Sequence, residues 1–168
     1  MKKLFSATKA PELTARDAIR QQKWSKALEY YQSRAASQER DYSLWNLVGD
    51  LHMSNKSRAQ AVEAWRRAIE GYVMEGLYEN ALGIARKMLR RAPEEEDVYL
   101  ILADAYLGLE YHADCLGQIR SYVKLAKHKS EPELRSAFKK ILESDLRNPH
   151  LLEELRSLYT DAGIEDID

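Results

Sequence analysis

The chain has 168 residues and a net charge of −1, and 45% of its residues are hydrophobic while 32% are charged. This length and apolar content suit one domain with a buried core. Seven glycines and four prolines favour a mostly helical chain. One cysteine excludes an internal disulfide framework and fits a reducing compartment. No apolar run reaches the ~18 residues of a membrane span, and no apolar stretch of a signal peptide follows the basic start. We therefore expect a cytoplasmic protein without membrane insertion.

Hydrophobic periodicity and helix-ending residues predict an all-α fold of about nine helices. We expect Leu13, Ala15, Ala18 and Ile19 to point inward from the first helix. Residues 1–9 are expected to be frayed, and residues 163–168 to form an acidic tail. The predicted helices span residues 11–22, 24–37, 42–53, 58–75, 78–91, 94–107, 111–127, 130–146 and 149–161.

Similar residues recur 34 positions apart, which indicates stacked helical hairpins. The pairs are Ala27 with Ala61, Tyr31 with Trp65, and Ala81 with Cys115.

The pattern of large, small and aromatic residues resembles the tetratricopeptide repeat (TPR), over about residues 10–127. The resemblance implies a right-handed α-solenoid of stacked antiparallel helix hairpins. In the central unit it is carried by Trp45, Val48, Gly49, Ala61, Trp65 and Ala68, and in the last unit by Tyr99, Leu102, Ala103, Tyr106, Cys115 and Ile119.

One spacing departs from the repeat, because Ala61 and Ala81 are only 20 positions apart. Two arrangements would account for the missing helix. Either residues 58–75 form one helix that belongs to two hairpins, or the stack breaks near Gly71. Residues 128–162 lack the repeat pattern, and we expect them to form a helical cap on the last apolar face. An extension that docks a partner is the alternative.

No arrangement of reactive side chains indicates an enzyme. The four histidines show no i, i+4 pair of the kind that binds a metal on a helix. Cys115 occupies the small-residue position of the repeat, so we expect a buried and inert thiol. The short basic clusters Arg66–Arg67 and Arg90–Arg91 are a weak nucleic-acid footprint in a chain of net charge −1. We expect no cofactor, no metal and no nucleic-acid partner.

The resemblance to the TPR family implies a concave groove lined by the first helix of each hairpin. Asp50, Glu70 and Asp104 take equivalent places on three helices, where they would pair with basic side chains of a partner. Ordinary helix solubility is the alternative explanation for these charges. The predicted groove residues are Arg16, Asn46, Asp50, Met53, Arg66, Glu70, Asp97, Leu100 and Asp104.

The sequence therefore predicts a non-enzymatic adaptor or scaffold that binds another protein or a peptide. Self-assembly is the alternative. The net charge is +5 over residues 1–40, +2 over residues 41–92 and −8 over residues 93–168. The basic start and the acidic end could join copies into a homo-oligomer.

Overall fold

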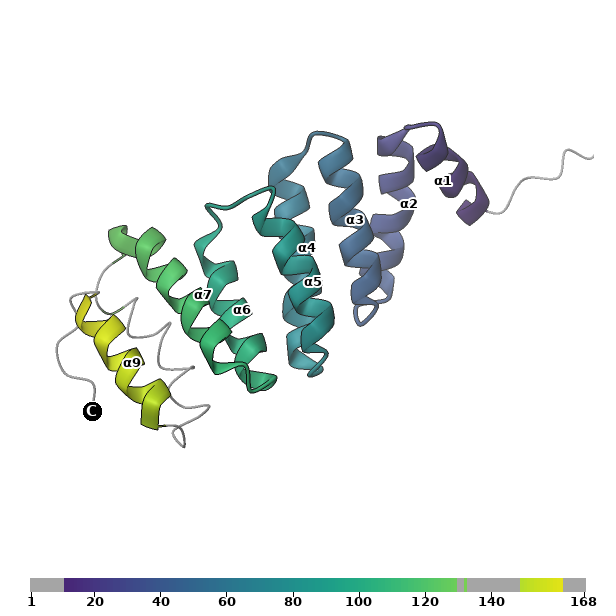
Figure 1. Ribbon diagram of the computed structural model, residues 1–168. Helices are drawn as coiled ribbons and strands as arrows, with labels where there is room; N and C mark the ends of the chain where they lie inside the picture. Colours follow the sequence, from purple (N-terminus) through teal and green to yellow (C-terminus); the bar gives the residue numbers. More distant parts are fainter. Residues whose placement is uncertain (1–10, 130–131, 133–148, 162–168) are drawn as a thin grey trace, which may run out of the picture. The chain divides into compact units, whose positions relative to one another are not determined.

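A computed structural model describes residues 11–129, 132 and 149–161 (Figure 1). In these residues it contains eight α-helices and one short 3-10 helix, so the predicted all-α fold is confirmed. The predicted helix over residues 130–146 lies almost wholly outside the described residues. The helices are α1 (Pro11–Arg20), α2 (Trp24–Ser37), α3 (Tyr42–Ser54), α4 (Arg58–Met74), α5 (Tyr78–Leu89), α6 (Glu96–Gly108), α7 (His112–Leu125), η1 (Ala126–His128) and α9 (Pro149–Asp161).

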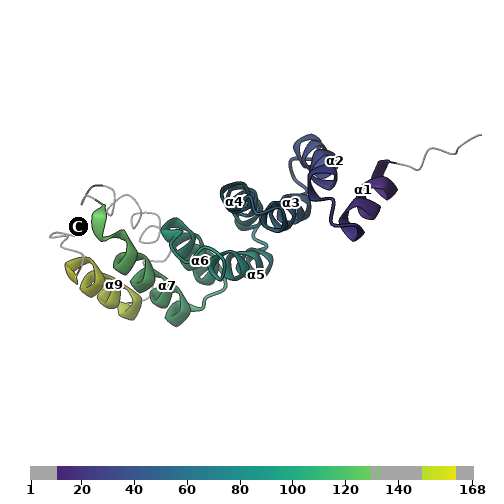
Figure 2. The same ribbon diagram turned by 90° about the horizontal axis from the view of Figure 1, so that it is seen from above.

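Helices that follow one another in the sequence pack against one another, in antiparallel order. Helix α2 lies between α1 and α3, and α6 lies between α5 and α7. Figures 1 and 2 both show α6 and α7 side by side. Helix α9 packs against α7. The chain divides into two compact units, Met1–Ala68 and Ile69–Asp168, and the boundary falls within α4.

Helix α4 runs without interruption for 17 residues, from Arg58 to Met74. It passes through Gly71, which is buried. The helix itself is therefore not broken at Gly71, although the boundary between the two units falls shortly before it, between Ala68 and Ile69. A single helix separates the turn after α3 from the turn before α5.

The turns that follow α1, α3, α4 and α6 have the same backbone geometry. In each, one residue has positive φ: Gln22 (56°), Lys56 (61°), Gly76 (71°) and Glu110 (61°). The N–H of that residue donates to the carbonyl three residues back, and the next N–H donates to the carbonyl five residues before itself. This is the Schellman motif, which satisfies the last carbonyls of a helix. The four positive-φ residues are 34, 20 and 34 positions apart. This is the same spacing that the sequence shows from Ala27 to Ala61, Ala81 and Cys115.

The buried residues follow the same spacing. Small side chains recur where helices approach closely, and larger ones fill the space beside them. The pairs that stand one repeat apart, with both members buried, include Ala27 with Ala61, Leu28 with Val62, Tyr31 with Trp65, Ala81 with Cys115, Leu82 with Leu116, Ala85 with Ile119 and Met88 with Tyr122.

One residue of the expected core is exposed. Leu13 keeps 54% of its surface in contact with solvent, while Ala15 and Ala18 of the same helix are buried. Successive residues of a helix are turned by about 100°, so Leu13 and Ala15 lie on nearly opposite sides of α1. Since the alanines face the core, Leu13 faces solvent, and its predicted inward position is wrong.

Candidate functional site

The predicted groove residues lie on α1, α3, α4 and α6, and they divide between the two units. Five belong to unit 1 and four to unit 2, so each group is described within its own unit. The residues of unit 1 are Arg16, Asn46, Asp50, Met53 and Arg66, and those of unit 2 are Glu70, Asp97, Leu100 and Asp104.

On α1, Arg16 is exposed and forms an ion pair with Glu12, at 2.8 Å between Nη2 and Oε1. Arg34 of α2 reaches the other oxygen of Glu12 at 3.2 Å. Glu12 thus ties α1 to α2 through Arg34. An exposed pair of this kind contributes only a few tenths of a kcal/mol, so the guanidinium of Arg16 can exchange Glu12 for another carboxylate at little cost.

Asp50 of α3 is half-buried and accepts a hydrogen bond from the indole N–H of Trp65, at 3.0 Å. Trp65 is 1% exposed, so its N–H needs an acceptor within the protein. Gly49 lies beside Asp50 and makes room for this ring, because a Cβ atom there would come within 2.3 Å of Trp65 Cδ1. The sequence placed Asp50 in a ligand groove, and in the structure its carboxylate also fixes a core tryptophan.

The other predicted residues of unit 1 are half-buried. Asn46 and Met53 lie on α3, and Arg66 lies on α4. Asn46 and Arg66 already have polar or electrostatic interactions within the protein. A ligand at these positions would have to compete with those interactions.

In unit 2, Asp97 takes part in a charge cluster at the start of α6. The Lys129 ammonium lies 2.9 Å from Asp97 and 2.8 Å from Glu96. It also lies 5.4 Å from the centre of the Tyr122 ring. Burial opposes the charge of Lys129, but its bonds to the two carboxylates outweigh that effect and raise the pKa of the ammonium. Asp97 therefore serves to hold the segment after α7 against α6.

Farther along α6, Leu100 and Asp104 are half-buried, and Glu70 on α4 is exposed. Asp104 lies near the Cys115 thiol. Burial and this carboxylate raise the pKa of the thiol to about 12. Cys115 is fully buried, as its small-residue position in the repeat predicts. A thiol that stays protonated at neutral pH is a poor nucleophile.

Unit 1 contains a groove of about 570 Å³ that the sequence did not predict. It is lined by Trp45 and His52 of α3 and by residues of α2 and α4. Arg67 of α4 lies over the Trp45 ring, 4.8 Å from its centre, and pairs with Glu63 at 2.9 Å. The groove offers an aromatic surface beside an exposed pair of opposite charges.

His52 is the most unusual side chain of this groove. Its Nε2 lies 2.7 Å from Gln32 Nε2, so one imidazole nitrogen forms a hydrogen bond with the amide. Its Nδ1 is buried and has no hydrogen-bond partner. Burial lowers the pKa of His52 and favours the neutral ring. The sequence did not predict this hydrogen bond, because Gln32 lies 20 positions earlier, on the neighbouring helix α2.

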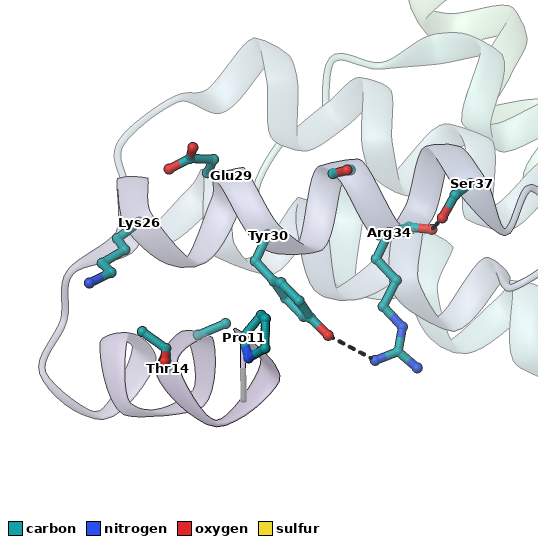
Figure 3. A pocket seen from close by; sticks show the side chains of 9 residues that line it. Pro11, Thr14, Lys26, Glu29, Tyr30, Arg34 and Ser37 are labelled. Atoms are coloured by element: carbon teal, nitrogen blue, oxygen red, sulfur yellow. Dashed lines mark hydrogen bonds between the residues drawn. The ribbon is translucent and has the colours of Figure 1, made fainter. Parts of the chain in front are cut away.

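A second hollow of about 640 Å³ lies between α1 and α2 (Figure 3). The Tyr30 hydroxyl points across it and lies 3.3 Å from Arg34 Nη1. Lys26, Glu29, Thr14 and Ser37 also line it. Since groups of both charges contribute to its lining, the hollow selects no ligand charge.

Neither family models nor curated proteins gave a match to this chain. In residues 11–129 and 149–161, no three His, Cys, Asp or Glu side chains gather in the way that metal ligands do. No helix of that same part is both long and apolar enough to cross a membrane.

Proposed function

We propose that this chain is a TPR-like helical repeat that acts as a non-enzymatic adaptor and binds a partner protein or peptide. The observation that carries the proposal is the recurrence of one hairpin turn at the spacing of the repeat, at Gln22 and Lys56 and again at Gly76 and Glu110. Stacked hairpins bury one side of each helix against their neighbours. They leave a long surface that extended or helical peptides can occupy.

Helix α6 supports this proposal most directly. Asp97, Leu100 and Asp104 follow one another at steps of three and four residues, so they share one side of the helix. Asp97 is exposed and the other two are half-buried. The opposite side is buried core, formed by Val98, Leu102 and Ala105. The Asp97 carboxylate is paired with Lys129, so the part of this side that suits a peptide with apolar and basic groups is Leu100 together with Asp104.

The test is affinity capture from a native lysate with a variant that neutralises the three equivalent acids. The changes are Asp50→Asn, Glu70→Gln and Asp104→Asn, and asparagine at position 50 keeps an acceptor oxygen for Trp65. A matched control neutralises three exposed acids elsewhere, with Glu29→Gln, Glu39→Gln and Asp161→Asn. All three proteins should have the same helicity and melting temperature before capture.

We expect the wild type and the control to retain a partner that the variant releases, and we expect high salt to weaken that capture. If all three proteins retained the partner equally, the prediction that Asp50, Glu70 and Asp104 bind it would be wrong.

Self-assembly is the second candidate, and the uneven distribution of charge along the chain favours it. Residues 1–40 carry a net charge of +5, and residues 93–168 carry −8. Sedimentation over a range of protein and salt concentrations tests it. We would expect the mass to fall as salt screens the attraction, whereas a monomer under all conditions would exclude this function.

A further inference from the structure

Two turns of unit 2 come together at one edge of the helix layer. The turn after α4 leads into Tyr78, and Gly108 ends α6. Their contact is so close that a Cβ atom on Gly108 would lie 2.3 Å from Tyr78 Cζ. The turn after α6 starts at Leu109, directly after Gly108. Figure 1 shows the start of α5 and the end of α6 at the same end of the neighbouring helices.

This edge exposes three large apolar side chains, of which the Tyr111 ring also contacts a core residue, the Tyr106 ring, at 6.5 Å between ring centres. Met74 is 77% exposed, Leu77 is 49% exposed and Tyr111 is 54% exposed. In the part of the chain that the structure describes, only two other large hydrophobic side chains are exposed, Leu13 and Leu125. A single exposed apolar residue is ordinary, but a group of them on adjoining turns is typical of an interaction site.

The charge of the edge has one sign. Glu75, Glu79 and Glu110 alternate with the three apolar residues and are exposed. Neither stretch that forms the edge contains a lysine or arginine, since none occurs in residues 68–85 or 92–119. Helix surfaces that serve only for solubility usually mix both signs, as α4 does with Glu63 and Arg67.

We propose that this edge docks a cationic amphipathic segment of a partner protein. Lysine or arginine side chains of the segment would pair with Glu75, Glu79 and Glu110, and its apolar side chains would cover Met74, Leu77 and Tyr111. The carboxylates repel nucleic acid and anionic lipid, whereas a basic helix or strand complements both the charge and the apolar surface. Met74 adapts its flexible side chain to the shape of the bound segment.

This edge is separate from the predicted groove, because none of its six residues belongs to the groove set. The two proposals can therefore fail independently. Variants of the edge should still capture the partner that the acids Asp50, Glu70 and Asp104 retain.

Defined peptides test the proposal on the full chain. The probe is a synthetic helix-forming peptide of five turns with lysines on one face and leucines on the other, and an analogue with glutamates in place of the lysines is the charge control. One variant removes the charge, with Glu75→Gln, Glu79→Gln and Glu110→Gln. Another removes apolar surface, with Leu77→Ser and Tyr111→Ser. The matched control changes other exposed sites of unit 2, with Leu125→Ser, Glu153→Gln and Asp161→Asn.

We expect the wild type and the matched control to bind the cationic peptide with the same Kd. Each edge variant should raise that Kd at least about tenfold, and the charge variant should also reduce its dependence on salt. The anionic peptide should not bind. Thermal melts identify any variant that has lost its fold, and the other edge variant then decides the question.

Three results would overturn the proposal. The first is that the edge variants bind the cationic peptide as tightly as the wild type does, and the second is that the anionic peptide binds equally well. The third is self-association of the wild type that the edge variants abolish, which would assign the edge to a second copy of the chain and not to a partner.

Discussion

Both units place a glycine against an aromatic ring of the neighbouring helix, but the two contacts lie at different depths. Gly49 is buried in the body of α3, beside a tryptophan that is 1% exposed. Gly108 is exposed at the end of α6, and the tyrosine over it is half-buried. An added Cβ atom would come within 2.3 Å of a ring atom at either place. The comparison separates the geometry of a contact from its cost, which depends on whether the neighbour can move.

The largest effect is expected for Gly49→Ala. The new methyl group would collide with Cδ1, Nε1 and Cγ of Trp65, and these atoms lie at the base of a ring that is closely packed and hydrogen-bonded to Asp50. Overpacking of a core costs about 1–3 kcal/mol, and we expect the upper end of that range. The measurement is the free energy of unfolding from denaturant titration.

Gly108→Ala is the matched control for that variant. Its methyl group would meet Cζ, Cε2 and Oη of Tyr78, which form the outer end of a side chain that can swing into solvent. Alanine also favours a helix over glycine by about 1 kcal/mol, so we expect a net change of less than about 1 kcal/mol. Equal losses at the two glycines would show that depth is not the deciding factor.

A smaller effect, about 2 kcal/mol, is expected for Trp65→Phe. Phenylalanine removes the indole N–H that Asp50 accepts and leaves part of the ring space empty. The counterpart in unit 2 is Tyr78→Phe, which keeps the ring over Gly108 and should cost less than about 0.5 kcal/mol. Denaturation midpoints for the two variants, compared in the same buffer, test the difference. A loss at Tyr78 as large as that at Trp65 would contradict it.

The positive-φ positions of two turns give a third comparison, in which one substitution should lower stability and the other should raise it. Gly76 occupies the positive-φ position of its turn, and an added Cβ atom would contact nothing within 4 Å. Gly76→Ala should therefore cost about 1 kcal/mol through backbone strain alone. Lys56 occupies the same position in unit 1 with φ of 61°. We expect Lys56→Gly to stabilise the protein by up to about 1 kcal/mol, and thermal melts of both variants measure the two signs.

The smallest effect is a dependence on pH that belongs to unit 1. Burial lowers the pKa of His52 in the folded state, so the unfolded chain binds a proton more readily. Stability is then fully present above the ordinary histidine pKa of about 6.5 and falls as the pH drops below it. His52→Gln should flatten this fall. An unchanged pH profile of the free energy of unfolding would show that His52 does not contribute.

Local signals predicted the helices well, because helix ends depend on residues close in sequence. Pro11 and Pro149 begin α1 and α9, and Gly76 follows α4. The regular spacing of small residues predicted which side chains are buried, from Ala27 to Cys115. The predicted inward position of Leu13 was wrong because it rested on the hydrophobicity of the side chain and not on its angle to Ala15 around the helix axis.

The environment of each predicted groove residue was harder to predict, because it depends on contacts between helices. Asp50 was chosen as a ligand for a partner, and its hydrogen bond to Trp65 joins α3 to α4. The need of a buried tryptophan for an acceptor was a usable signal. Residue spacing did not predict the groove around Trp45 or the contact of His52 with Gln32. Both depend on residues of α2, which lies outside the pair formed by α3 and α4.

The unbroken α4 has a consequence for how such a chain can change length over generations. Its two ends are flanked by the same turn, at Lys56 and Gly76, so a single helix and not a pair of helices separates these two turns. Duplication or loss of coding sequence need not proceed in whole hairpins. The long interval between two turns holds two helices, and the short interval holds one. Gain or loss of one helix together with its turn would therefore leave each remaining helix with a turn at its end. Insertions and deletions of a single helix are thus an available route of divergence for this architecture.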